Sequence, residues 1–174
     1  MVAVRLGRVV VLVHHYDEAL AFYTERFGCE VVLDRPGPDG LRFVHVRFPG
    51  DAAAIWLLRP GGETGADRVG AQTGGEPVAV LYTDDLHELV ARWRSRQVHF
   101  RVDPYESEGT QVCHVLDLYG NEFVAVQLAE LTGSPPARFG TPTEWFGPLD
   151  QATEFNQPGE FGEPPADDAP NHLQ

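Results

Sequence analysis

The side chains best suited to chemistry in this sequence are two histidines, one glutamate and one arginine. His45 and His114 stand in similar surroundings, and Glu122 follows the second histidine closely. Imidazole and carboxylate groups bind divalent cations, so these three residues could form a metal site, although single strand histidines are more often structural or pocket residues. Arg8 is either an exposed residue at the start of a strand or a partner for a ligand carboxylate, enolate, phenolate or aromatic ring.

The two histidines occupy equivalent positions in an internal repeat. Shifting the sequence by 69 residues aligns hydrophobic and polar positions without a gap, and one residue inserted in the second copy then aligns Gly50-Asp51 with Gly120-Asn121. Matches spread evenly along one register indicate a duplicated unit. The matched pairs are Val9 and Val78, Val11 and Val80, Leu20 and Leu89, Asp34 and Asp103, and His45 and His114.

Each copy predicts the element order β-α-β-β-β. Short runs of β-branched residues predict strands, and apolar residues at helical spacing predict one helix per copy, around residues 19–27 and 86–93. Gly28 is placed to end the first helix, and Asp84-Asp85 followed by Glu88 resembles a cap at the start of the second. The predicted strands are residues 9–13, 29–34, 42–48 and 53–58, then 78–82, 98–103, 111–117 and 122–128.

These elements predict one domain over residues 1–130, with module one at 5–60, a linker at 61–75 that has flexible glycine pairs, and module two at 76–128. Residues 131–174 form an acidic, Pro/Gly-rich C-terminal extension that cannot build its own core. The extension nevertheless carries aromatic residues at intervals, so part of it is expected to lie on a surface. These aromatic residues are Phe139, Trp145, Phe146, Phe155 and Phe161.

Composition excludes several classes of partner. The formal net charge of -13 argues against binding to nucleic acid or to an anionic membrane, because like charges repel. The apolar run at residues 9–13 is too short for a signal peptide or a membrane span, which favours a cytoplasmic protein. Cys29 and Cys113 lie in apolar stretches without metal-ligand spacing and are expected to be buried reduced thiols. His14 and His15 precede the first helix, where a solvated or capping role is expected.

The two modules resemble the vicinal oxygen chelate superfamily, which includes glyoxalase I, extradiol dioxygenases, fosfomycin-modifying enzymes and bleomycin resistance proteins. The resemblance covers residues 5–128 and depends on two motifs. These motifs are Ala19-Leu20-Ala21-Phe22-Tyr23 with Phe27-Gly28, and Asp117-Leu118-Tyr119-Gly120-Asn121. The resemblance implies an α+β fold in which two tandem βαβββ modules form curved half-barrel sheets with the helices outside. It also implies a small-molecule pocket and favours a homodimer.

The resemblance further implies where metal ligands would lie. Metal-dependent members place a His or Gln about seven residues before the Asp that opens the helix, and a Glu four residues after the Gly of the Asp-x-x-Gly-Asn turn. These positions fall on Arg8 and near Pro77, and on Val124 and about Ala54. Arginine is permanently charged and the other three side chains have no donor atom, so we expect no metal and no other cofactor.

The sequence therefore predicts a metal-independent small-molecule binding protein of the glyoxalase/bleomycin-resistance type, which sequesters an aromatic natural product or antibiotic. One alternative is a lyase, isomerase or oxidoreductase with non-standard site residues, either a metalloenzyme using His45, His114 and Glu122 or a cofactor-free enzyme using Arg8 and His114. Another is an interaction module that acts through its C-terminal extension. The candidate ligand-binding residues are Arg8, Arg47, Trp56, Tyr82 and His114.

Overall fold

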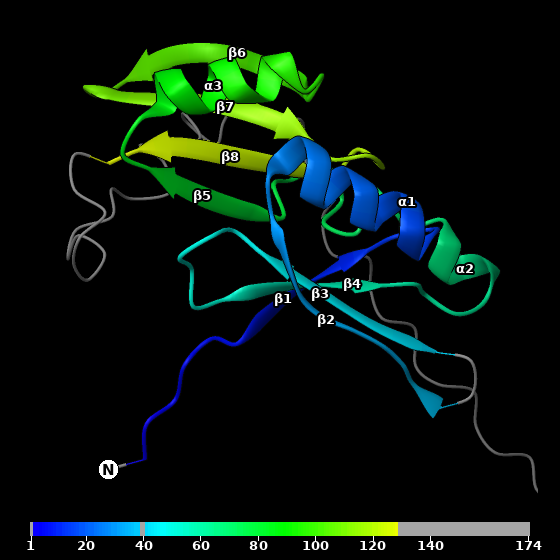
Figure 1. The fold of residues 1–174 in the computed structure, drawn as a ribbon. Coiled ribbons are helices and arrows are strands. Elements are labelled where there is room, and N and C mark those ends of the chain that lie inside the picture. The colour runs from blue at the N-terminus through cyan, green and yellow to red at the C-terminus, as the bar shows by residue number, and fades with distance from the viewer. Residues whose placement is uncertain (1, 39–40, 129–174) are drawn as a thin grey trace, which may run out of the picture. The chain divides into compact units, whose positions relative to one another are not determined.

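Two four-stranded sheets, each with its own helix, make up the part of the chain that the structure describes (Figure 1). The computed structural model describes residues 2–38 and 41–128, so the predicted extension at 131–174 lies outside the described residues. The elements are β1 Arg8–Leu12, α1 Tyr16–Ala21, η1 Phe22–Phe27, β2 Glu30–Pro36, β3 Arg42–Arg47, β4 Ala54–Leu58, α2 Glu63–Ala66, β5 Ala79–Thr83, α3 Leu86–Ser95, β6 His99–Ser107, β7 Thr110–Leu116 and β8 Glu122–Gln127.

The strand order confirms the predicted duplication. The first sheet has the order β1-β4-β3-β2 and the second the order β5-β8-β7-β6. In each sheet the first strand pairs in parallel with the fourth, and the remaining neighbours are antiparallel. The α+β fold of paired βαβββ modules is therefore confirmed, and the two sheets formed by the described residues are open.

Alternation along the strands divides each sheet into two faces. In module one, Val44, Val46, Ile55 and Leu57 are buried in a core that also contains residues of both helices, including Tyr23 of the first helix. The intervening residues of the same strands lie on the opposite face. Because the helices cover only one face of the sheet, the second face is the one left for a site.

The first helix differs from the prediction in its geometry. The structure divides the single predicted helix into α1 and a π-helical turn, η1, whose buried residues are Phe22, Tyr23 and Phe27. A single wide turn is too short to change the apolar pattern detectably, so the 3.6-residue period did not reveal it. Gly28, with φ of 85°, ends the helix in the left-handed region as predicted.

The segment between the modules holds more structure than the flexible linker that the sequence predicted. It contains the short helix α2, and the side chain of Gln72 binds the edge of β1. The Gln72 amide accepts from the backbone N–H of Leu12 at 2.7 Å and donates to the carbonyl of Val10 at 2.9 Å. One glutamine thereby satisfies backbone groups that an edge strand would otherwise expose.

Both cysteines are buried and unpaired, as predicted. Burial raises the pKa of Cys29 to about 12 and that of Cys113 to about 11, so both remain neutral thiols. Within the described residues, no helix has the length and apolar composition needed to cross a membrane.

A buried hydrogen bond joins the first helix of module one to the β7–β8 turn of module two. The Tyr23 hydroxyl donates to Oδ2 of Asp117 at 2.8 Å, and Asp117 is only 5% exposed. Oδ1 of Asp117 accepts from the backbone N–H groups of Tyr119 and Asn121, and the Asn121 amide donates to Oδ2. Burial, and then the charge and hydrogen bond of Asp117, raise the pKa of Tyr23 well above its usual value, so its hydroxyl remains a donor.

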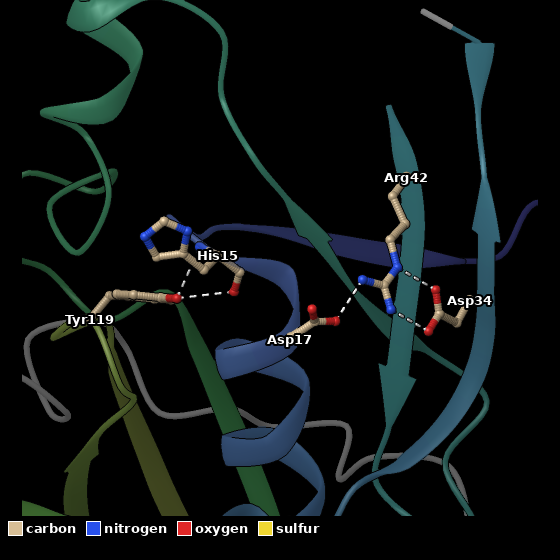
Figure 2. Close-up of polar contacts among 5 residues, drawn as sticks. All are labelled: His15, Asp17, Asp34, Arg42 and Tyr119. Atoms are coloured by element: carbon tan, nitrogen blue, oxygen red, sulfur yellow. Dashed lines mark hydrogen bonds and ion pairs between the residues drawn. The ribbon is translucent and has the colours of Figure 1, made fainter. Parts of the chain in front are cut away.

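Polar contacts hold the start of α1 from two sides (Figure 2). On one side, the Tyr119 hydroxyl accepts from the backbone N–H of His15 and donates to its carbonyl, both at 3.1 Å. On the other side, Arg42 makes a bidentate pair with Asp34 at 2.6 and 2.7 Å and donates to Asp17 at 2.6 Å. His15 is the N-cap residue, and its exposed side chain makes no capping bond, so of the two roles expected, solvated or capping, its imidazole has the solvated one.

We expect Tyr23→Phe to lower the free energy of unfolding by about 2 kcal/mol, because it removes a hydrogen bond to a buried carboxylate. Urea denaturation at pH 7 measures the loss. The matched control is Tyr119→Phe, which removes hydrogen bonds at an exposed site and should cost less than about 1 kcal/mol. Equal losses in the two variants would contradict the role given to the buried bond.

The Arg42 cluster predicts a pH-dependent contribution to stability. The hydrogen bond from Arg42 is the largest cause lowering the pKa of Asp34 in the folded chain. A carboxyl whose folded pKa is depressed contributes stability above its unfolded pKa, about 3.9, and loses it as pH falls through the folded value. Arg42→Met should therefore destabilise the protein at pH 7 and flatten the fall in stability below about pH 4. Urea denaturation from pH 7 to 3 measures the free energy of unfolding of this variant. The control is Arg92→Met, which removes an exposed i,i+4 ion pair. If the free energy of unfolding of the Arg42 variant falls with pH as steeply as that of the unaltered protein, the prediction is wrong.

Candidate functional site

A candidate site lies on the face of module one's sheet that points away from the helices. Arg8 comes from β1, His45 from β3 and Trp56 from β4. His45 and Trp56 are directly opposite each other in the β3–β4 ladder, and Arg8 is opposite Ala54 in the β1–β4 ladder. Alternation along the strands therefore places all three side chains on one face.

Arg8 and His45 form the central contact of this face. Nε of Arg8 donates to Nδ1 of His45 at 2.9 Å. A guanidinium is only a donor, so Nδ1 must present its lone pair, and the proton of the neutral imidazole must be on Nε2. Burial is the largest cause lowering the pKa of His45, followed by the charges of Arg8 and Arg35, which keeps the ring neutral.

Aromatic contacts surround His45. Its ring meets Trp56 edge to face, with ring centroids 5.6 Å apart, and Phe43 lies 6.2 Å from Trp56 on the same face. The guanidinium of Arg35 lies 5.7 Å from the Phe43 ring centroid. The face therefore combines aromatic surface with two cationic groups.

The equivalent face of module two carries a different polar cluster. Glu122, 7% exposed, accepts from Arg101 and lies 2.5 Å from Nδ1 of His114. Since the carboxylate accepts, Nδ1 of His114 carries the proton, and Nε2 faces the Tyr105 hydroxyl at 3.3 Å. The sequence predicted His114 and Glu122 together only as possible metal ligands. It gave no sign of Arg101 and Tyr105, because contacts between strands leave no mark in local motifs.

The ladders correct the predicted repeat register. His45 pairs with Trp56, whereas His114 pairs with Val124, so the residue equivalent to Val124 is Trp56 rather than Ala54. Eleven positions separate the first pair (56 − 45) and ten the second (124 − 114), so the extra residue belongs to the first copy. The shift of two residues keeps the same face, which is why the expected face was still right.

The residues at these positions do not fit a divalent cation. Arg8, Trp56 and Val124 have no lone pair suited to a metal, and Pro77 precedes β5 with no side-chain donor. The alternative ligand set of His45, His114 and Glu122 is not assembled within the chain, since no three His, Cys, Asp or Glu groups among the described residues could hold an ion together.

The structure separates the predicted ligand-binding residues. Arg8 and Trp56 lie together beside His45, while His114 lies in the other sheet. Arg47 ends β3, pairs with Glu30 at 2.5 Å and lines a hollow of about 150 Å³ between the modules. Tyr82 of β5 lines a second hollow of about 460 Å³. His45 was expected to be a structural or pocket residue or a metal ligand, and it was not among the candidate ligand-binding residues. In the structure it links Arg8 to Trp56.

Comparison with known proteins identifies relatives of this fold. Residues 5–124 match the family model described as the Glyoxalase/Bleomycin resistance protein/Dioxygenase superfamily. An uncharacterized protein of Shewanella frigidimarina is 30% identical over 122 residues, which cover 69% of this chain and 90% of that protein.

Solved structures show the same similarity. UcmS2 is 27% identical to this chain, with a TM-score of 0.65. A superfamily member from Sphaerobacter thermophilus is 26% identical, with a TM-score of 0.63. Each match covers 72% of this chain and 98% of the solved chain. TnmS3, an antibiotic binding protein from Streptomyces sp. CB03234, shares the fold at 24% identity and a TM-score of 0.59, covering 73% and 98% of the two chains.

Removal of the buried Glu122 charge from the module-two cluster should lower the stability of the protein markedly. We expect Glu122→Gln to lower the free energy of unfolding by about 2 kcal/mol, because an amide weakens the contacts with both His114 and Arg101. Asp103→Asn is the control, since Asp103 pairs with Arg94 at an exposed position and should cost less than about 1 kcal/mol. Urea denaturation measures the free energy of unfolding of both variants. An equal loss in the two would mean that the cluster contributes no more stability than an exposed ion pair.

Proposed function

Because the chain belongs to the Glyoxalase/Bleomycin resistance protein/Dioxygenase superfamily, we propose that it is a metal-independent small-molecule binding protein. The ligand proposed is an aromatic natural product or antibiotic, which the protein sequesters without altering it. In this proposal the protein is a cytoplasmic homodimer, and its ligand-binding residues are Arg8, Arg47, Trp56, Tyr82 and His114.

The observation that carries the proposal is the Arg8–His45 contact. Arg8 occupies a position at which metal-dependent members carry a ligand, and its guanidinium donates to the nearest imidazole at 2.9 Å. A permanent cation there repels a divalent ion and uses the Nδ1 lone pair of His45. The same groups, set among Phe43 and Trp56, are suited to an uncharged or oxygen-bearing aromatic molecule.

The relatives support a small organic ligand. TnmS3 is described as an antibiotic binding protein and shares this fold. A binding role in this chain agrees with an intact scaffold whose metal positions hold arginine, tryptophan and valine side chains.

The module-two cluster favours one alternative, a cofactor-free acid–base enzyme. Glu122 orients His114 by its Nδ1, and Nε2 stands 3.3 Å from the Tyr105 hydroxyl. A histidine oriented by a carboxylate is a common arrangement for a general base, and would suit an isomerase or a lyase. In that case the unaltered protein would convert its ligand and His114→Gln would abolish the turnover, whereas sequestration predicts that the ligand is recovered unchanged.

We expect aromatic natural products to raise the melting temperature of protein treated with a chelator. At 100 times the dissociation constant, a ligand that binds only the folded state adds about 2.7 kcal/mol of stability. A thermal-shift panel of such compounds, run beside Zn²⁺, Mn²⁺, Ni²⁺ and Fe²⁺ on protein without a His tag, makes the measurement. Mass spectrometry of the released ligand then separates sequestration from turnover.

Matched arginine variants locate the site. Arg8→Met should abolish most of the ligand-induced shift, while Arg5→Met, three residues earlier and also exposed, should leave it unchanged. Stabilisation by a metal alone, with no response to any organic compound, would refute the proposal.

A further inference from the structure

The two repeat-related histidines hold their protons on opposite ring nitrogens. Arg8 donates to Nδ1 of His45, which leaves the proton on Nε2, whereas Nδ1 of His114 carries its proton toward Glu122. Duplication supplied the same residue in both sheets, and the neighbouring charge decides what each ring offers. His45 offers an N–H donor from Nε2, whereas Nε2 of His114 faces the Tyr105 hydroxyl at 3.3 Å.

Among the residues that the structure describes, the N–H donor of His45 is buried without an acceptor. His45 is 6% exposed, and neither its Nε2 nor Nε1 of Trp56 has a hydrogen-bond partner within the described part of the chain. Their rings lie 5.6 Å apart in cross-strand contact. A buried unpaired donor costs about 1–3 kcal/mol, so two neighbouring ones are an energetic cost that a bound acceptor would remove.

Arg8 adds a third source of donors to the same place. Its bond to His45 uses only Nε–H, one of the five N–H groups of the guanidinium, and no other bond from Arg8 is formed within the described residues. The contacts among Arg8, His45, Trp56 and Phe43 include no carboxylate. These contacts therefore supply no acceptor for the N–H groups of Arg8, His45 and Trp56. The local chemistry is therefore one of donors beside aromatic surface.

We propose that this face of module one binds a ligand through an acceptor oxygen on an aromatic ring system, held by the N–H groups of His45 and Trp56 beside Arg8. The inference deepens the proposed function and depends on it. Carbonyl, phenolate and carboxylate oxygens share the required chemistry, while the flat rings of Trp56 and Phe43 provide stacking surface for the remainder of the ligand. An aromatic hydrocarbon of the same shape would leave both donors unpaired.

The first test reads the protons directly, without ligand. Long-range ¹H–¹⁵N correlation spectra of histidine-labelled protein at pH 7.5 distinguish the two tautomers. We expect the Nε2–H form at His45 and the Nδ1–H form at His114, and we expect Arg8→Met to introduce the Nδ1–H form at His45 alone. An Nδ1–H tautomer at His45 in the unaltered protein would overturn the inference.

The second test uses three naphthalene probes of similar shape: 2-acetylnaphthalene, 2-naphthoate and 2-ethylnaphthalene. The two oxygen-bearing probes should bind about tenfold or more tightly than the hydrocarbon, which corresponds to one recovered hydrogen bond. They should also shift the indole N–H signal of Trp56 and the Nε2–H signal of His45. The indole N–H of Trp93 already donates to the carbonyl of Phe27 and should not respond.

Trp56→Phe keeps an aromatic ring but removes the N–H, so it should reduce the preference for the oxygen probes while leaving hydrocarbon affinity nearly unchanged. The melting temperature of the variant confirms that it is folded. Equal binding of all three probes, or an equal loss for all three in Trp56→Phe, would overturn this inference and leave the proposed function standing. Failure of all three probes to bind, while natural products still stabilise the protein, would also overturn it. If neither probes nor natural products bind, the proposed function falls as well.

Discussion

The hydrogen bond from Tyr23 to Asp117 is the contact on which the arrangement of the two modules most depends. Each family motif supplies one partner: Tyr23 belongs to the helix signature and Asp117 opens the turn before the last strand. The same carboxylate fixes the turn by accepting from the N–H groups of Tyr119 and Asn121. Its burial makes the interaction demanding, because a buried carboxylate left without donors is costly. Two motifs that look separate in sequence are therefore halves of one interface.

The position of η1 follows from this contact. The wide turn brings Phe22, Tyr23 and Phe27 into the core together, and Trp93 of α3 donates to the Phe27 carbonyl at 3.3 Å. The helices pack in that shared core against one face of each sheet. The opposite face of each sheet is therefore left for other roles. The site residues then vary without disturbing the interface, as the contrast between Arg8 with His45 and Glu122 with His114 shows.

The sequence predicted the fold well because duplication and strand patterning are recorded at many positions at once. It was less informative where one long-range contact decides the outcome. No local pattern indicates that Arg8 binds a histidine 37 residues away, or that Gln72 covers the edge of β1. The repeat register failed between His45 and Trp56 because matching Gly50-Asp51 with Gly120-Asn121 placed the extra residue in the second copy, whereas the ladders place it in the first. The error of two residues was harmless for the face of a strand, whose period is two, but it concealed that Trp56, rather than Ala54, occupies the position where a metal ligand was expected.

Charge acts on the proposed site at two different ranges. The net charge of -13 belongs to the whole chain, and physiological salt screens such a field over about 8 Å. Arg8, Arg35 and the N–H groups of His45 and Trp56 act at contact distance, where screening is weak. Selection of a ligand on this face would therefore follow the local donors rather than the acidic character of the chain. In module one, Arg8 occupies a position where the family resemblance predicted a metal ligand, and its guanidinium supplies a permanent positive charge and N–H donors there instead of a lone pair.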